Sequence, residues 1–385
     1  MSQTPIKQNF SVTFTYQLYF TEHLFNIENP LFKTVVEGYK THTRLKVLFV
    51  IDHGVERAHP ELRNSIVNYC KSHSECLEYT ASLVIPGGEV CKNDPEAVQT
   101  VLRAINEEHI DRHSFVVAIG GGAIIDMAGY AAAIAHRGVK LIRIPTTVLS
   151  QNDSAVGVKN SVNSFEKKNF LGTFAPPYAI INDTVFLHTL EQRDWIAGIA
   201  EAIKVALIKD RAFFEYLEGN AEGLKNREMI PMEYVIYKCA EMHMHHIAQG
   251  GDPFENGSSR PLDFGHWAAH KMEQMSNYEL RHGEAVAKGI ALDMVYAHLT
   301  GLVSETVLNR ILNVMKAIGF DLRIPVSTDQ EMDTLLLGIQ EFQEHLGGEL
   351  CITLISEIGV KHDVNSISYD TMKRAITELN HTYLN

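Results

Sequence analysis

The sequence lacks the cysteine pairs of a structural zinc site and has no excess of basic residues. Its cysteines are odd in number and scattered, at Cys70, Cys76, Cys91, Cys239 and Cys351. This pattern argues against a disulfide framework and predicts reduced thiols in a cytoplasmic protein. Lysine and arginine number 34 against 47 acidic residues, and the formal charge of −13 argues against nucleic acid as a partner.

Long apolar runs are also missing. No stretch reaches the roughly 18 apolar residues of a membrane span, and the first residues lack the apolar core of a signal peptide. We therefore expect a soluble protein that is not exported and has no membrane partner. The composition is that of a globular protein, with 45% hydrophobic and 21% charged residues. A chain of 385 residues is long for a single core, which favours two domains.

Apolar runs in the first half of the chain alternate with helical patterns. Residues 46–51, 81–85, 114–119 and 141–144 read as buried parallel strands, which predicts a doubly wound α/β domain of the Rossmann type. After residues 179–183 the apolar spacing becomes that of helices. We place the boundary between the domains so that residues 1–184 form the α/β domain and residues 185–385 form a helical domain.

Glycines at two strand ends indicate a dinucleotide site. Gly120, Gly121 and Gly122 lie between a strand and a helix, where backbone amides and the helix N-terminus can hold a pyrophosphate. Asp52, also at a strand end, suits a ribose hydroxyl, and Gly87-Gly88-Glu89 follows a further strand. The motif is not GxGxxG, and each feature alone could be a structural turn or a helix cap.

Histidines in the second half indicate a metal site. His266 and His270 are spaced i and i+4 on a predicted helix, His282 follows in Arg-His-Gly-Glu, and Glu201 is a candidate third ligand. Three ligands leave positions open for substrate, as in catalytic zinc sites. The alternatives are core histidines and an exposed ion pair between Glu201 and Lys204. His243-Met-His-His246 is a weaker candidate, because consecutive helical residues cannot converge on one ion.

Polar residues after the fourth strand suggest an anion site. Asp153 and Lys159 are followed by Lys168 and Asn169, and clustered lysines in an acidic protein are suited to a phosphate. A solvated turn would have the same composition.

Together these motifs resemble the 3-dehydroquinate synthase family of sugar phosphate cyclases, from about Asp52 to Val360. The matching positions are the Gly-Glu-x-x-Lys motif with Glu89 and Lys92, the glycine block ending at Asp126, Arg137-Gly, Pro-Thr146-Thr147, Asp153 to Lys159, Lys168-Asn169, Glu201-x-x-Lys204, Phe-Gly-His266 and His282-Gly-Glu.

The resemblance implies a role for each position. It implies an NAD-binding N-terminal domain, an all-helical metal-binding C-terminal domain, zinc or cobalt as the metal, and a homodimer. The implied metal ligands are Glu201, His266 and His282. The implied NAD contacts are Asp52, Glu89, Lys92, Gly120, Gly121, Gly122, Asp126, Thr146 and Thr147. The implied substrate residues are Asp153, Lys159, Lys204, Arg260, Asp263 and His270, with Arg137, Lys168 and Asn169 on the phosphate and Arg137 coming from either chain of the dimer.

The resemblance also implies a reaction. NAD transiently oxidises a hydroxyl of a heptulose 7-phosphate, phosphate is eliminated, the hydride returns, and an intramolecular aldol step closes a carbocycle.

The carboxylate-binding positions of dehydroquinate synthases differ here. Asp263 replaces an asparagine, His245 and Ser259 replace a lysine and an arginine, and Arg260 is displaced by one residue. A phosphate-contacting lysine is also missing from residues 343–346. The aspartate resembles cyclases that use sedoheptulose 7-phosphate, such as 2-epi-5-epi-valiolone synthases, whose substrate has no carboxylate.

The sequence favours a sugar phosphate cyclase with a carboxylate-free substrate, and three alternatives remain open. The first is a true 3-dehydroquinate synthase with a rebuilt carboxylate site. The second is an oxidoreductase of the metal-dependent alcohol or glycerol dehydrogenase type, against which the Ala-Glu201-Ala-Ile-Lys204 motif argues. The third is a non-catalytic binding protein that keeps the metal as structure.

Overall fold

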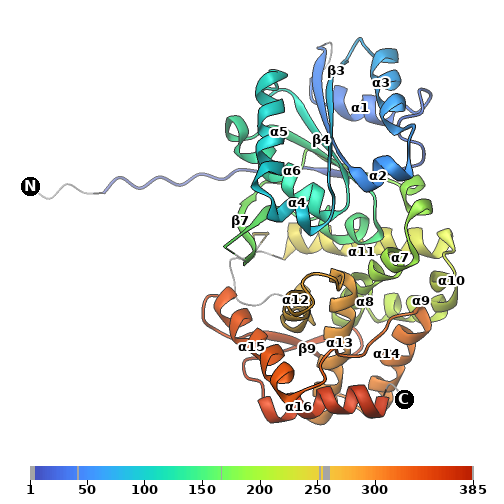
Figure 1. Ribbon diagram of the computed structural model, residues 1–385, viewed down its shortest axis with the longest axis vertical. Helices are drawn as coiled ribbons and strands as arrows, with labels where there is room; N and C mark the ends of the chain where they lie inside the picture. The colour runs from blue at the N-terminus through green and yellow to red at the C-terminus, as the bar shows by residue number, and fades with distance from the viewer. Residues whose placement is uncertain (1–4, 41–42, 166, 251–252, 255–260, 384–385) are drawn as a thin grey trace, which may run out of the picture.

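The computed structural model describes residues 5–40, 43–165, 167–250, 253–254 and 261–383. It has an α/β part from the first half of the chain and a mainly helical part from the second half, with helix α11 (Met229–Gln249) lying between them (Figure 1). None of the described helices is long and apolar enough to span a bilayer.

Six parallel strands form the sheet of the first part. Their aliphatic sequences suit burial on both faces, and all six residues of β4 are buried. Helices α5 (Pro95–Glu107) and α6 (Gly122–Ile134) cover one face, and α1 (Leu31–Glu37) and α3 (Leu62–Ser72) cover the other. The strands are β1 (Gln17–Thr21), β2 (Leu45–Asp52), β3 (Leu77–Ile85), β4 (Phe115–Gly120), β5 (Lys140–Pro145) and β8 (Ala179–Asp183).

The strand order places a binding crevice at the carboxyl ends of the central strands. The order is β1-β8-β5-β4-β2-β3, so the chain runs from β2 to β3 on one side and then crosses to β4 on the other. In open α/β sheets, ligands bind beside the carboxyl ends of the strands where the winding direction changes. Here those ends carry Asp52 and Gly120.

The segment between β5 and β8 forms a π-helical turn, η2 (Ser150–Ser154), and an antiparallel hairpin of β6 (Lys159–Ser164) and β7 (Lys167–Phe174). Arg143 of β5 anchors it. Its fully buried guanidinium donates to the carbonyl oxygens of Ala155 at 2.7 Å and Gly157 at 2.5 Å, and to Asn160 Oδ1 at 2.8 Å. The sequence patterns did not predict this hairpin, which carries two of the candidate lysines, Lys159 and Lys168.

The second part has one continuous apolar core. Its principal helices are α7 (Gln192–Ala197), α8 (Ile199–Lys209), α9 (Arg211–Gly219), α10 (Ala221–Lys225), α11, α12 (His266–Met275), α13 (His282–Leu299), α14 (Glu305–Ile318), α15 (Asp329–His345) and α16 (Tyr369–Glu378). The expectation of an all-helical domain is wrong in one respect. Strands β9 (Ile352–Glu357) and β10 (Val360–Val364) form an antiparallel hairpin, whose buried β9 residues belong to the same core.

The predicted α/β class is confirmed by the parallel sheet and its covering helices. The last strand of the sheet, β8, ends at Asp183, and the 3-10 helix η3 (Thr184–Thr189) leads into the helices. The division at residues 184 and 185 remains a prediction. Strand β1 was not anticipated. It forms the outer edge of the sheet through parallel pairing with β8.

Candidate metal and dinucleotide site

Three helices bring Glu201, His266 and His282 together. Glu201 comes from α8, and the two histidines begin α12 and α13. Glu201 Oε1 lies 3.6 Å from His266 Nε2 and 3.6 Å from His282 Nε2. The carboxylate is fully buried, and Oε1 has no hydrogen-bond partner among the described residues.

This geometry fits a divalent metal ion. Ligand atoms about 2.1 Å from a tetrahedral zinc lie about 3.4 Å apart, close to the separations seen here. The ligand atoms of the three residues all lie within 4.8 Å of one another. A buried carboxylate oxygen without a hydrogen-bond partner and two imidazole nitrogens are suitable donors for zinc or cobalt. The candidate ligands suggested by the sequence therefore converge.

The start of α12 is held tightly against α13, which directs the first histidine. Gly265 has φ of +78°, and a Cβ there would lie 2.7 Å from the backbone nitrogen of Ile290. Buried Asp293 accepts hydrogen bonds from the Gly265 N–H at 3.1 Å and from Trp267 Nε1 at 2.9 Å. His266 Nδ1 lies 3.1 Å from the Phe264 carbonyl oxygen, so Nε2 is left for the metal.

Electrostatics tune the three ligands differently. Burial opposes ionisation of Glu201, but Lys204 and His282 lower its pKa to about 2. Burial and the charge of Lys204 hold the pKa of His266 well below its ordinary value, so this ring is neutral. Burial disfavours the charged form of His282, but Glu273 and Glu201 raise its pKa to about 9. A metal ion must therefore displace a proton from His282.

Glu273 is a site residue that the sequence analysis missed. It is buried in α12, its Oε2 lies 3.2 Å from His282 Nδ1, and its Oε1 accepts from Lys168 Nζ at 2.7 Å. The pKa of Glu273 is lowered, because His282 and Lys168 outweigh the effect of burial. The available signal was its position three residues after His270, which puts both on one face of the helix. Glu273 links the metal ligands to the β6–β7 hairpin.

Lys204 and Asp153 complete a charged cluster beside the metal ligands. Lys204 is 2% exposed and pairs with Glu201. Burial disfavours its charge, but Glu201 and Asp153 raise its pKa above the ordinary value, and Asp263 contributes to the rise. Asp153 Oδ1 lies 2.9 Å from His243 Nδ1. Burial and Glu201 would raise the pKa of Asp153, but His243 and Lys204 hold it below its ordinary value.

His243 therefore has a different place from the one considered in the sequence. The described residues that could hold a metal do not include it, and it faces Asp153 instead. His270 lies with the metal ligands, since its ring centroid is 5.5 Å from that of His266 and 6.0 Å from that of His282. Asp263 ends the 3-10 helix η4 (Pro261–Asp263), just before these ligands. Arg260 lies outside the described residues.

The glycines and Asp52 meet at the crevice of the sheet. Asp52 caps α2 (His53–Ala58) by accepting from the Gly54 N–H at 2.7 Å, and burial raises its pKa. A Cβ on Gly87 would lie 2.0 Å from Asp52 Oδ2, and one on Gly122 would lie 2.6 Å from Ser154 Oγ. A Cβ at either position would therefore have to displace the side chain of Asp52 or of Ser154. Gly121 is the N-cap of α6, whose exposed amides suit a pyrophosphate.

The other candidate nucleotide residues flank this crevice. Glu89 begins α4 (Glu89–Asn93) and accepts from Asn163 Nδ2 at 2.6 Å. Lys92 is 5% exposed and donates to Asp126 Oδ2 at 2.7 Å and to Asn169 Oδ1 at 2.5 Å. It ties α4 and α6 to the hairpin, which is a structural role in addition to the predicted one. Thr146 and Thr147 follow β5, and Thr147 Oγ1 lies 2.8 Å from Ser150 Oγ.

The candidate phosphate residues have different surroundings. Lys168 reaches across to Glu273, whereas Asn169 bonds to Lys92 and to Ser161. Lys159 is exposed at the start of β6. Arg137 ends the short helix η1 (Ala135–Arg137), beyond the end of α6 that is distant from Gly122. The 13 residues of α6 span about 20 Å, so Arg137 is far from the glycine turn at Gly122.

Comparison with known proteins identifies the family. Residues 82–197 match the family described as 3-dehydroquinate synthase N-terminal, and residues 198–340 match 3-dehydroquinate synthase C-terminal. The 3-dehydroquinate synthase of Shewanella sp. (strain MR-4) is 36% identical over 297 residues, which cover 77% of this chain and 81% of the relative. The chain belongs to the 3-dehydroquinate synthase family of enzymes, as its motifs predicted.

Solved structures add a second kind of relative. ValA, a 2-epi-5-epi-valiolone synthase from Streptomyces hygroscopicus subsp. jinggangensis 5008 solved with NAD+ and Zn2+ bound, has a TM-score of 0.87 and 30% identity, covering 97% of this chain and 99% of that one. A glycerol dehydrogenase from Schizosaccharomyces pombe has a TM-score of 0.63 at 17% identity, covering 94% and 88%. The latter likeness concerns the fold alone.

Proposed function

We propose that the protein is an NAD- and metal-dependent sugar phosphate cyclase that acts on a heptulose 7-phosphate without a carboxylate, such as sedoheptulose 7-phosphate. The proposed substrate class rests on one observation, the position and charge of Asp263. It ends η4 three residues before the metal ligand His266, and its charge acts on Lys204 inside the site.

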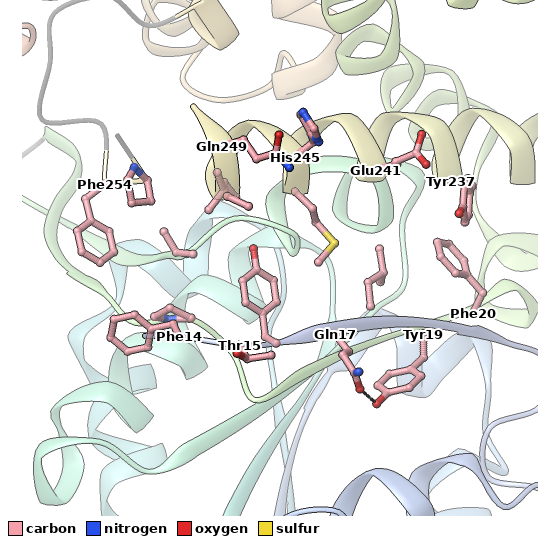
Figure 2. A pocket seen from close by; sticks show the side chains of 18 of the residues that line it. Phe14, Thr15, Gln17, Tyr19, Phe20, Tyr237, Glu241, His245, Gln249 and Phe254 are labelled. Atoms are coloured by element: carbon pink, nitrogen blue, oxygen red, sulfur yellow. Dashed lines mark hydrogen bonds between the residues drawn. The ribbon is translucent and has the colours of Figure 1, made fainter. Parts of the chain in front are cut away.

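The negative charge of Asp263 would distinguish substrates that have a carboxylate from substrates that lack one. A substrate carboxylate would meet a second carboxylate at Asp263, and like charges in a partly buried site repel. An aspartate accepts hydrogen bonds from hydroxyl groups, which a carboxylate-free heptulose offers in its place. The helix that carries a lysine in dehydroquinate synthases has His245 at that position. His245 is one of the residues that line the cavity between α11 and β1 (Figure 2).

In this proposal the residues of the chain bind and orient the substrate. Glu201, His266 and His282 would hold the metal ion, and the crevice at Asp52 and Gly120–Gly122 would hold NAD. When bound, NAD accepts and returns a hydride, and the divalent metal lowers the pKa of hydroxyl groups that it holds. Glu201 and Lys204 are buried, so the groups that they contact would be shielded from water.

The remaining polar side chains would hold the two ends of the substrate. Asp153 and Lys204 would orient hydroxyl groups, and His270, whose ring lies beside that of His266, would exchange a proton with the substrate. Lys168 and Lys159 would compensate the phosphate charge. Arg137, which lies at the opposite end of α6 from the glycine turn, would reach the phosphate of a second copy in a homodimer.

The second candidate is a 3-dehydroquinate synthase, which the 36% identity to the Shewanella enzyme favours. One experiment separates the two. The purified protein with NAD and zinc or cobalt is offered sedoheptulose 7-phosphate and 3-deoxy-arabino-heptulosonate 7-phosphate in parallel, and phosphate release is measured. We expect release from the former. Release from the latter alone would refute a carboxylate-free substrate. Net accumulation of NADH with an alcohol, and no phosphate release, would indicate a dehydrogenase.

A further inference from the structure

Residues 5–16 form an extended arm that leaves the body of the protein (Figure 1). Apolar residues occur at every second position from Phe10 through Val12 and Phe14, and the same alternation continues into β1. Successive side chains of an extended strand point to opposite faces, so these residues share one face. Phe10 is 83% exposed, Val12 63% and Phe14 56%. An apolar strand face of this length needs a cover.

The arm continues an edge of the sheet that is open. β1 pairs with β8 on one side, and no other described strand pairs with its outer side. Its unpaired backbone groups can accept another strand, as in association by β-strand addition. The arm has the composition of a strand, because residues 6–16 contain neither glycine nor proline and are rich in aromatic, valine and threonine residues.

A cavity of about 850 Å³ lies beside the arm, between β1 and α11 (Figure 2). Leu18 of β1 and Phe14, at the base of the arm, line one wall, and Met244 and Ala248 of α11 line the other. Phe20 and Tyr237 close one end with ring centroids 5.3 Å apart. The lining is mostly apolar, and its size suits several large side chains rather than water.

We propose that the cavity receives the outer part of the arm of a second copy of this chain, with Phe10, which packs against Phe14 in the cavity wall, and that the first copy's arm enters the second cavity in return. Arm and cavity are adjacent in each chain, so one two-fold axis allows both insertions, as an isologous interface requires. The 11 residues from 6 to 16 extend about 37 Å, far enough to leave their own body. The arm is also free of acidic residues and carries Lys7, so it does not repel a protein with a charge of −13.

The surface area that two exchanged arms would bury agrees with that of a specific dimer interface. A buried aromatic side chain removes about 150–250 Å² from water, so Phe10 and Phe14 at their exposed fractions offer on the order of 250 Å² per arm. Two arms double this area, and the cavity walls lose a similar amount. The total is on the order of 1,000 Å², the lower limit for specific interfaces, before the remaining arm residues are counted.

Sedimentation velocity on the full chain tests this interface. We expect a dimer that dissociates at least roughly 100-fold more readily in the double variant Phe10→Asp/Phe14→Asp, because two buried aromatic contacts per arm are lost. The matched control, Ser11→Asp/Thr13→Asp, adds the same charges on the opposite face and should remain dimeric. Circular dichroism and thermal unfolding check that the body of each variant is intact.

A second variant tests the cavity without changing the arm. Ala248→Trp fills the space between α11 and β1 and should also yield monomers. A monomeric wild type, or a dimer that resists both the arm and the cavity variants, would overturn the proposal. An arm that fills the cavity of its own chain would also overturn it, and would appear as a monomer in which both variants lower the melting temperature. None of these readouts needs substrate, so this proposal can fail independently of the proposed cyclase activity.

Discussion

Glu273 Oε2 lies 3.2 Å from Nδ1 of His282, which leaves Nε2 of the same ring 3.6 Å from Glu201 Oε1. The buried carboxylate of Glu273 therefore sets the orientation of the His282 ring, a candidate metal ligand, by contacting the ring nitrogen that does not face Glu201. Its second oxygen accepts from Lys168 on the hairpin of the α/β part. One side chain thus connects the metal ligands with a residue proposed to bind phosphate.

Glu273→Gln should weaken metal binding about tenfold, because the neutral amide no longer supports the basicity of His282. Competition with a zinc chelator at a pH above the raised pKa of His282, about 9, measures this affinity without substrate and without competition from a proton on His282. Glu341→Gln, which removes the partner of Lys271 at another position on α12, is the matched control and should bind zinc like the wild type. Equal zinc affinity in Glu273→Gln and wild type would contradict the positioning role.

Metal affinity should rise with pH. Glu273 and Glu201 raise the pKa of His282 to about 9, so below that pH a proton occupies the ligand. The metal must displace this proton, and affinity should increase about tenfold per pH unit up to pH 9. Chelator competition between pH 7 and pH 10 tests this slope. The charge on His282 also stabilises the metal-free protein, because its pKa is higher in the folded state than in the unfolded state. This stabilisation is complete below pH 6.5 and is lost as pH rises through 9.

Glu201→Gln should destabilise the metal-free protein by about 3 kcal/mol, because Lys204 is then buried without its ion-pair partner. Urea unfolding in the presence of a chelator measures the change. In the double variant Glu201→Gln/Lys204→Met most of the loss should be recovered, since no lone charge is buried. A double variant as unstable as the single one would show that packing, and not charge, is responsible.

Gly87→Ala should reduce NAD affinity at least about tenfold. Its Cβ would lie 2.0 Å from Asp52 Oδ2, so the capping carboxylate must move from the crevice. Calorimetric titration with NAD tests this, and zinc binding should be unchanged because the metal ligands lie on other helices. Gly219→Ala, where an added Cβ meets nothing within 4 Å among the described residues, is the control.

Asp263→Asn should lower turnover of sedoheptulose 7-phosphate by roughly tenfold or more while zinc content is retained, because one charged hydrogen-bond acceptor is lost. Steady-state phosphate release measures it. Asp370→Asn at the exposed start of α16 is the control. Unchanged kinetics in Asp263→Asn would remove the argument for the substrate class.

Much of the site could be inferred from local sequence. Gly120–Gly122 at a strand end and the spacing of His266 and His282 each reflect a constraint of a few neighbouring residues. Glu273 and His243 could not be assigned this way, because their roles depend on partners that are distant in the chain. The hairpin that carries Lys159 and Lys168 was missed because its strands alternate weakly and are mostly polar.

The sequence alone determined the alternation of strands and helices, the glycine turns and the residue types able to hold a metal, since these follow from the chemistry of short segments. Only the tertiary structure decided which of these side chains meet. Glu201, His266 and His282 converge because the close approach at Gly265 places α12 against α13 and α8 lies beside α13. Lys168 meets Glu273 of α12 because the β6–β7 hairpin reaches the helical part, a contact between residues 105 positions apart that no local pattern encodes.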